Sequence, residues 1–263
     1  LKTLRPEVAF SGVGGPLMEA EGMQSLFPME ELSVMGLIEV LPKYRHLRAR
    51  IAQTARAAAA FAPDALITID SPDFCLRVAH AARHMTPELR TIHYVAPTVW
   101  AWRPGRAAKM APDIGHVLAL FPFEPPYMQA AGMSCDFVGH PVVAEPRGTS
   151  ADAAAFRNTH MIGTDQPLLL CLPGSRKGEV TRLLPKFEAA LALLAGTQPS
   201  LRVAMPTVRG VSPIVRQIVA NWCQPPLVLE AASDKLAAFA AADLALAASG
   251  TVSLELAANR VPM

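Results

Sequence analysis

Cysteine is scarce in this sequence, and the cysteines that occur are not arranged in pairs. The four residues Cys75, Cys135, Cys171 and Cys223 show no CxxC spacing, and three of them lie inside apolar runs. We therefore expect buried free thiols. No group of His, Cys and carboxylate residues has metal-ligand spacing, so the sequence predicts neither a metal site nor a cofactor.

Long hydrophobic runs and strong net charge are also missing. The most apolar stretch, 236–248, is interrupted by Asp243 and falls short of the ~20 apolar residues that span a membrane. The first six residues lead into a strand-like run, so no signal peptide is expected. A net charge of +2 is too small to favour nucleic-acid binding. We therefore expect a soluble or peripheral, cytoplasmic protein.

The composition that is present favours a folded, well-packed protein. Apolar residues make up 51% of the 263 residues and charged residues 17%, which supports at least one sizeable core. The length suits one large domain or two domains of ordinary size. Much of the mean hydropathy of +0.26 comes from alanine, which favours helices but buries little area per residue.

Short apolar runs alternate with longer amphipathic segments along the chain. The expected strands are 8–13, 65–69, 91–95, 117–121, 136–138, 168–172, 203–205, 227–230 and 244–247. The expected helices are about 47–61, 74–84, 104–111, 177–195, 212–222, 235–241 and 251–259. Continuous apolar strands are typical of parallel sheets that are covered on both faces. The repeated βα order predicts a doubly wound α/β architecture.

Residues 141–150 interrupt this βα order. Two prolines, one glycine and small polar residues make the segment a predicted linker. The βα pattern restarts at Leu168. We therefore predict two Rossmann-like domains, 1–145 and 146–263, that face a cleft.

The turn around Arg176 is the strongest local candidate for anion binding. Gly174 and Ser175 permit a tight turn between an apolar strand and a helix, whose free N–H groups and dipole favour negative charge. The Arg176 guanidinium can grip a diphosphate with two hydrogen bonds. The spacing is not that of a P-loop, and the alternative is an ordinary helix cap with a surface arginine.

A second turn of the same kind contains Ser249, Gly250 and Thr251. It also follows an apolar strand and opens a helix, so its hydroxyls can cap the helix or bind a phosphate. Glu255 lies one helical turn further along the same face, where a carboxylate suits the paired hydroxyls of a ribose. The alternative is a capped helix in which Glu255 complements the dipole.

Asp70 and Asp73 come at the end of a buried strand in the first half of the chain. The carboxyl ends of parallel strands line the binding crevice, where an aspartate can accept a proton from an attacking hydroxyl. We expect this role for Asp70. Asp73 is expected instead to be the N-cap of the helix that follows.

Two tryptophans, Trp100 and Trp102, precede Arg103 after the next expected strand. They can form an apolar wall for a sugar or an acyl chain. The alternative is the packing of a helix end against the sheet.

A basic cluster at 43–50 lies beside the apolar residues Leu37, Ile38, Val40 and Leu41. Such a cluster can dock on an anionic membrane surface. The alternative is the solvated start of a helix.

These motifs, together with several others, resemble those of the lipid A disaccharide synthases, in the same order over nearly the whole chain. The matching stretches are Gly14-Gly15-Pro16-Leu17-Met18, Met29-Glu30-Glu31-Leu32-Ser33-Val34-Met35-Gly36, Ile69-Asp70-Ser71-Pro72-Asp73-Phe74, His93-Tyr94-Val95-Ala96-Pro97-Thr98-Val99-Trp100-Ala101-Trp102-Arg103, Phe121-Pro122-Phe123-Glu124, Phe137-Val138-Gly139-His140, Leu172-Pro173-Gly174-Ser175-Arg176 and Ala248-Ser249-Gly250-Thr251.

The resemblance implies a two-domain glycosyltransferase B-type fold and an inverting, metal-independent transfer in lipopolysaccharide biosynthesis. The donor would be UDP-2,3-diacylglucosamine, and the acceptor 2,3-diacylglucosamine 1-phosphate, which attacks through its 6-hydroxyl. The products would be a β-1,6-linked disaccharide 1-phosphate and UDP. The enzyme would lie peripherally on the inner face of the inner membrane.

The resemblance also implies roles for individual residues. Asp70 would be the catalytic base. The UDP and its diphosphate would be bound by Gly174, Ser175, Arg176, Ser249, Gly250, Thr251 and Glu255. Independently of the resemblance, we expect the acceptor and its acyl chains to contact Met35, Trp100, Trp102 and Arg103.

The sequence departs from the family pattern at both ends. It lacks the family's first strand with its loop of glycine, glutamate and serine, and the later strand and C-terminal helices, which can join a dimer. We therefore expect a chain truncated at both ends and inactive alone.

Two alternative functions remain to be distinguished from this one. The first is another UDP-sugar enzyme of the same fold, such as an epimerase or the peptidoglycan N-acetylglucosaminyltransferase. The second is a non-catalytic nucleotide-sugar or lipid-binding module.

Overall fold

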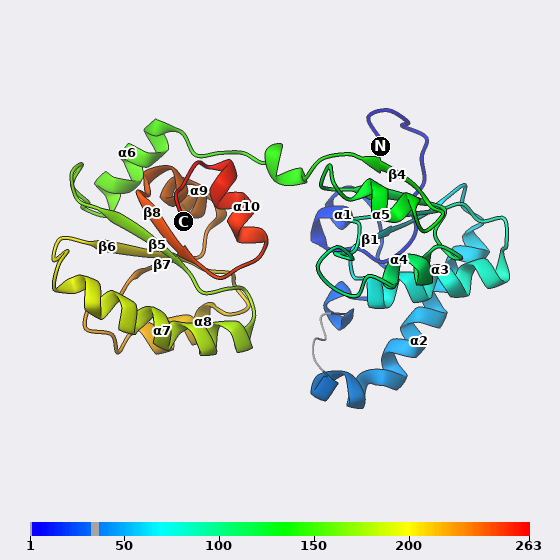
Figure 1. The fold of residues 1–263 in the computed structure, drawn as a ribbon, viewed down its shortest axis with the longest axis horizontal. Coiled ribbons are helices and arrows are strands. Elements are labelled where there is room, and N and C mark those ends of the chain that lie inside the picture. The colour runs from blue at the N-terminus through cyan, green and yellow to red at the C-terminus, as the bar shows by residue number, and fades with distance from the viewer. Residues whose placement is uncertain (1, 33–36) are drawn as a thin grey trace. The chain divides into compact units, whose positions relative to one another are not determined.

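The chain forms two compact units. The computed structural model describes residues 2–32 and 37–263. The units are Leu1–His140 and Pro141–Met263, and each has its own parallel sheet (Figure 1). The predicted α/β class with parallel sheets is confirmed.

Unit 1 is built on four parallel strands in the order β1-β2-β3-β4. These are β1 (Leu66–Ile69), β2 (Thr91–Tyr94), β3 (His116–Ala119) and β4 (Ser134–Phe137). Its helices are α1 (Pro16–Ala20), η1 (Met29–Leu32), α2 (Leu37–Phe61), α3 (Pro72–Met85), α4 (Arg106–Met110) and α5 (Pro125–Gln129). Because all of these strands pair in parallel, the loop after each strand starts at the same edge of the sheet.

Two apolar clusters hold unit 1 together. Met110, Val117 and Met128 are among the fully buried side chains of the larger cluster, which joins α4, β3 and α5. In the smaller cluster Ala55 of α2 meets Ala82 of α3, and neither side chain is exposed. Alanine at this contact lets the two helix backbones approach closely. The alanine-rich composition therefore contributes through close helix packing more than through buried area.

One expected strand of unit 1 is wrong. Residues 8–13 form no strand, and only a single bridge joins Gly12 to Ser25. Phe10 is 40% exposed, so the apolar run is not buried in the way that a central parallel strand would be. Helix α2 also begins ten residues before the expected start at 47.

Unit 2 has four parallel strands in the order β7-β6-β5-β8. They are β5 (Leu168–Leu172), β6 (Arg202–Pro206), β7 (Leu227–Leu229) and β8 (Leu244–Ala247). The helices are η2 (Pro141–Val143), α6 (Ser150–Thr159), α7 (Lys177–Ala195), α8 (Ser212–Val219), α9 (Ala232–Ala241) and α10 (Thr251–Ala258). Strands β5, β6 and β7 proceed in one direction across the sheet, and β8 returns to the other side of β5.

Strand β5 is buried over its whole length because helices cover both of its faces. Leu168, Leu170 and Leu172 point into a cluster with residues of α6, α9 and α10. Leu169 and Cys171 alternate with them and pack against α7 and α8 on the opposite face (Figure 1). The continuous apolar run in the sequence follows directly from this two-sided burial.

Helix α6 was not predicted, although its start carries a sequence signal. Thr149 and Asp152 form a capping box, in which each side chain accepts a hydrogen bond from the other residue's backbone N–H. Phe156 then anchors the helix in the core. The preceding Gly148 packs against α9, where a Cβ atom would collide with the Leu236 carbonyl oxygen. At least one of the small residues on which the linker prediction rested, Gly148, is therefore needed for close packing against α9.

The cysteines are free thiols in different environments. Cys135 and Cys171 are buried, Cys75 is half-buried and Cys223 is exposed, so the expectation of burial is wrong for Cys223. Burial raises the pKa of Cys171 to about 12 and those of Cys75 and Cys135 to about 11. None of the described helices is long and apolar enough to cross a membrane.

We predict that Cys223 alone reacts rapidly with a thiol reagent in the native protein. The thiolate is the reactive species, and burial suppresses both access and ionisation at the other three positions. Stopped-flow absorbance with Ellman's reagent should show one fast equivalent, with the remaining thiols released on unfolding. The Cys223→Ser variant should lose the fast phase. A second fast equivalent in the native wild type would contradict the burial of the other thiols.

Candidate functional site

The two predicted UDP-binding turns lie on adjacent strands in unit 2. Leu172 at the end of β5 pairs with Ala247 at the end of β8, and the Ala248 N–H donates to the Leu172 carbonyl at 2.8 Å. The strand order reverses between β5 and β8, so this edge is a topological switch point. In open α/β sheets, ligands bind outside the carboxyl ends of the strands at such a point.

The turn after β5 brings Arg176 to the start of α7. Gly174 has a φ of +108°, which favours glycine, and Arg176 is the N-cap residue of the helix. The Arg176 side chain is 57% exposed and its Nη1 donates to Glu179 Oε1 at 2.8 Å. A Cβ atom on Gly174 would lie 2.6 Å from Glu179 Oε2. Sequence reasoning missed Glu179, whose carboxylate orients the guanidinium from the first turn of α7.

The turn after β8 leaves its two hydroxyl groups available. The N-cap of α10 is Gly250, which has a φ of +148° and no side-chain capping hydrogen bond. Ser249 and Thr251 are exposed and make no side-chain hydrogen bond to the part of the chain that the structure describes. The alternative in which these hydroxyls cap the helix is therefore wrong.

Glu255 lies one turn into α10, where its carboxylate is paired with the Lys235 ammonium of α9. Lys235 also lies over the Phe239 ring, 5.5 Å from its centroid. The carboxylate is only 23% exposed and is held in place by this pair. Lys235 was not among the predicted site residues, because nothing in the sequence spacing links it to α10.

In unit 1 the carboxyl ends of all four strands meet at one edge. Asp70 follows β1, and its N–H donates to the Tyr94 carbonyl of β2 at 2.9 Å. Val95 and Val138 continue this pattern, donating to Leu118 and Ala119 of β3. The edge therefore collects the candidate loops that begin at Asp70, His93, Phe121 and Phe137.

Asp70 is exposed, and its backbone is in a strained conformation that sets the direction of its side chain. Asp70 and Ser71 have φ values of +47° and +42°, both in the left-handed region. Such residues cost on the order of 1–3 kcal/mol each and cluster at functional sites. The strained turn ends β1 abruptly and starts α3 two residues later.

Asp73 was expected to cap α3, and this prediction is wrong. The helix begins at Pro72, and its N-cap is Ser71, which makes no side-chain capping hydrogen bond. Asp73 lies inside the first turn, where its carboxylate accepts a hydrogen bond from Arg106 Nη2 at 3.3 Å. Proline at the first helical position takes over the role of defining the start of the helix.

His93 is a fully buried neighbour of Asp70. Its Nδ1 lies 2.8 Å from Thr68 Oγ1 on β1, and its Nε2 is buried without a hydrogen-bond partner in the described part of the chain. Burial lowers the pKa of His93 to about 4, and the negative charge of Asp70 only partly opposes this shift. The imidazole is therefore neutral at pH 7 and does not neutralise the Asp70 carboxylate.

The tryptophans after β2 lie on the surface. Trp100 and Trp102 are 45% and 62% exposed, so packing of a helix end against the sheet does not account for them. Trp100 meets Phe123 edge-on at 5.2 Å, and Phe123 stacks on Phe121 at 5.6 Å. The Arg103 guanidinium lies 5.2 Å from the Trp102 ring centroid. Residues from the loops after β2 and β3 thus form one exposed aromatic surface.

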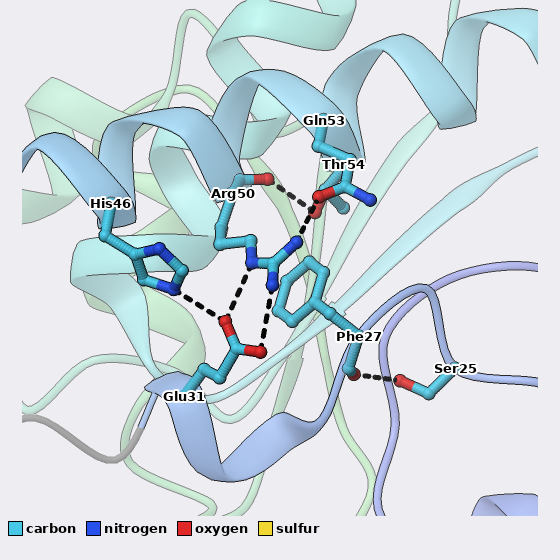
Figure 2. Close-up of polar contacts among 7 residues, drawn as sticks. All are labelled: Ser25, Phe27, Glu31, His46, Arg50, Gln53 and Thr54. Atoms are coloured by element: carbon cyan, nitrogen blue, oxygen red, sulfur yellow. Dashed lines mark hydrogen bonds and ion pairs between the residues drawn. The ribbon is translucent and has the colours of Figure 1, made fainter.

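Glu31, Arg50 and His46 fasten the end of η1 to α2 (Figure 2). Glu31 accepts hydrogen bonds from Arg50 at 2.8 and 2.9 Å, and its Oε2 lies 2.6 Å from His46 Nε2. The hydrogen bonds from Arg50 hold the pKa of Glu31 below its usual range. Arg50 also lies over the Phe27 ring, 4.5 Å from its centroid.

This contact changes the interpretation of the basic cluster at 43–50. The Arg50 guanidinium forms an ion pair with Glu31 within unit 1, whereas the side chains of Arg45 and Arg48 are exposed. Met35, which was predicted to contact acyl chains, lies outside the described residues, and so do the side chains of 37–44.

Metal-binding geometry is not found in the parts of the chain that the structure describes. Residues 2–32 and 37–263 contain no group of three His, Cys, Asp or Glu residues that could hold a metal ion.

We predict that His93 makes the fold less stable in mild acid. The pKa of His93 is lower in the folded than in the unfolded protein, so the unfolded state binds the proton first as the pH falls below about 6.5. This one group should lower the free energy of unfolding by about 2 kcal/mol between pH 7 and pH 5. Urea denaturation of wild type and His93→Gln at both pH values measures it. Equal pH slopes in the two proteins would contradict the buried, neutral imidazole.

Comparison with known proteins identifies relatives of the whole chain. A family model described as lipid-A-disaccharide synthetase matches residues 1–263. A lipid-A-disaccharide synthase from Ruegeria pomeroyi is 60% identical over 271 residues, which cover 100% of this chain and 67% of the relative. One from Rhodospirillum centenum is 52% identical over 99% of this chain and 65% of the relative. The chain thus spans about two thirds of the length of these curated relatives.

Solved structures with the same fold are far less similar in sequence. A UDP-GlcNAc 2-epimerase from Neisseria meningitidis, bound to UDP-GlcNAc, superposes with a TM-score of 0.60 at 10% identity, covering 89% of this chain and 66% of the epimerase. A putative UDP-N-acetylglucosamine 2-epimerase from Listeria monocytogenes has a TM-score of 0.61 at 12% identity, covering 96% of this chain and 77% of that one. At these identities the likeness concerns the fold alone, which is of the glycosyltransferase B type.

Proposed function

This chain belongs to the lipid-A-disaccharide synthetase family, and on that premise we propose that its full-length protein is an inverting glycosyltransferase. It transfers 2,3-diacylglucosamine from its UDP derivative to the 6-hydroxyl of 2,3-diacylglucosamine 1-phosphate. The products are a β-1,6-linked disaccharide 1-phosphate and UDP. The observation that carries the proposal is the meeting of two candidate anion-binding turns at the β5/β8 switch point, in a chain that matches the family along its whole length.

Unit 2 is proposed to bind the UDP part of the donor. Arg176, pre-oriented by Glu179, contacts the diphosphate together with the backbone of Gly174 and Ser175. The free hydroxyls of Ser249 and Thr251, beside Gly250, face the same edge of the sheet. Charge that develops on the leaving diphosphate is stabilised by these groups and by the N-termini of α7 and α10, so the proposed mechanism uses no metal. Glu255, held by Lys235, is proposed to bind the ribose.

Unit 1 is proposed to bind the acceptor and to activate it. The Asp70 carboxylate is exposed at the carboxyl edge of the sheet and accepts the proton of the 6-hydroxyl as the oxygen attacks the anomeric carbon. His93 is buried and neutral, so it supplies no counter-charge beside Asp70. Trp100, Trp102, Arg103 and Met35 are proposed to contact the acceptor and its acyl chains.

The proposed setting is the cytoplasmic face of the inner membrane. The exposed side chains of Arg45 and Arg48 would attract an anionic lipid surface by charge. The protein would bind peripherally there, where both lipid substrates reside. The full-length protein is proposed to act as a homodimer.

The reaction is tested with the complete gene product and residues 1–263 side by side. Each is incubated with UDP-2,3-diacylglucosamine and the 1-phosphate acceptor in the presence of EDTA, and mass spectrometry detects the disaccharide. Product from the complete protein supports both the reaction and its independence of metal. Absence of product in the complete protein, with UDP binding intact, rejects the assignment in favour of another UDP-sugar enzyme or a binding module.

We expect Asp70→Asn to lower turnover by roughly 10²–10⁴, because an amide cannot accept the hydroxyl proton. UDP binding, measured by titration calorimetry, should not change, since Asp70 lies in the other unit. Asp64→Asn provides the matched control, because Asp64 is an exposed carboxylate that precedes β1 at the amino edge of the sheet. Near-normal turnover of Asp70→Asn would remove Asp70 from the role of base.

A further inference from the structure

A basic groove lies between α3 and α4 in unit 1. Its volume is about 730 Å³. The groove is lined by Pro72, Asp73, Leu76, Arg77, His80, Arg103, Gly105, Arg106, Lys109 and Asp113. All of these residues belong to unit 1, so the groove is a feature of that unit alone.

Positive charge in the groove exceeds negative charge, and the two carboxylates are already engaged. Asp73 is paired with Arg106 at 3.3 Å, and Asp113 with His80 at 3.0 Å. Two cations, Arg77 and Lys109, form no ion pair or hydrogen bond with the described residues.

Arg103 brings a further unpaired cation to the same groove. Its guanidinium lies over the Trp102 ring and forms no ion pair or hydrogen bond with the part of the chain that the structure describes. Arg77, Lys109 and Arg103 therefore present three cations to one concave surface, and neither of its two carboxylates is ion-paired with them. Such an arrangement suits a ligand with concentrated negative charge.

The groove begins at the first residues of α3, Pro72 and Asp73. Helix α3 starts two residues after Asp70, and Arg77 follows Asp73 by four positions, which places both on one face of the helix. One turn of helix advances about 5.4 Å, so Arg77 lies roughly one turn beyond Asp73. Arg103, from the loop after β2, reaches the groove from the neighbouring strand.

We propose that this groove binds the phosphate of the acceptor sugar and so directs the acceptor's 6-hydroxyl to Asp70. The inference rests on the proposed function, and it assigns the phosphate to Arg77, Lys109 and Arg103. A phosphate monoester carries close to two negative charges near neutral pH, which two or more cations match, and arginine can contact its oxygens with two hydrogen bonds. The 1-phosphate is on C1, and the 6-hydroxyl is attached through C6 to C5; these two ring carbons flank the ring oxygen. Holding the phosphate therefore restricts where the hydroxyl of the same sugar can lie.

The test compares two acceptors in the complete gene product: 2,3-diacylglucosamine 1-phosphate and the same sugar without its phosphate. For Arg77→Ala and Lys109→Ala, kcat/KM for the phosphorylated acceptor should fall roughly tenfold or more, as for the loss of a hydrogen bond to a charged group. The value for the dephosphorylated acceptor and the KM for the donor should stay the same. Arg90→Ala is the matched control, because Arg90 is an exposed cation just before β2, at the amino edge of the sheet.

An equal fall for both acceptors would indicate a structural role and would overturn the proposal, and so would no fall for either. Titration calorimetry with short-chain forms of the two sugars separates this result from failure of the proposed reaction. Loss of phosphate-dependent binding in Arg77→Ala supports the groove even if no disaccharide forms. Undiminished binding of the phosphorylated sugar overturns it.

Vesicles distinguish the acceptor from a lipid headgroup as the source of the phosphate. Wild type and Arg77→Ala should bind equally to vesicles of phosphatidylglycerol and phosphatidylcholine. Weaker vesicle binding by Arg77→Ala, with the preference between the two sugars unchanged, would assign the groove to the membrane and overturn the proposal.

Discussion

Parallel pairing of the strands is the constraint on which the rest of this protein depends. Every strand pair in the described structure is parallel, so each strand must be followed by a crossover, and all carboxyl ends meet at one edge of each sheet. Asp70 and the loops after β2, β3 and β4 meet at one such edge. The turns that contain Arg176 and Ser249 meet at the other. Both candidate sites are therefore consequences of topology before any side chain is considered.

The sequence predicted the parts of this structure that depend on local pattern. Six of the helices and all eight strands of the two sheets lie close to their expected positions, and α2 ends at the expected residue but begins ten residues earlier. The strands were predictable because two-sided burial makes them continuously apolar. The run at 8–13 is apolar like the strands, but it forms only an isolated bridge and joins neither sheet. The composition of a segment does not show whether another strand will pair with it. Helix α6 was missed because Pro141, Pro146 and Gly148, which precede it, indicated a linker, although Thr149 and Asp152 carry the capping signal.

The candidate sites were predictable only in part. Each turn is formed by residues close together in the sequence, whereas the side chains that contact these residues can come from distant elements. The glycines and hydroxyls of the two unit 2 turns are visible in the sequence. Glu179, which orients Arg176, is also close in sequence, but Lys235 reaches Glu255 from a different helix. The groove that contains Arg77 and Lys109 depends on how α3 packs beside α4, and no spacing in the sequence brings these two residues together.

The left-handed pair at Asp70 and Ser71 has a consequence for how this fold can change. The direction of the carboxylate is set by backbone torsion rather than by a network of side-chain partners. A glycine at position 71 would relieve the torsion and favour the fold, but it would also widen the range of directions in which the carboxylate points. A substitution that raises thermal stability at this turn would therefore make the direction of the Asp70 carboxylate less well defined. Variants selected only for stability are expected to lose activity through changes at this turn.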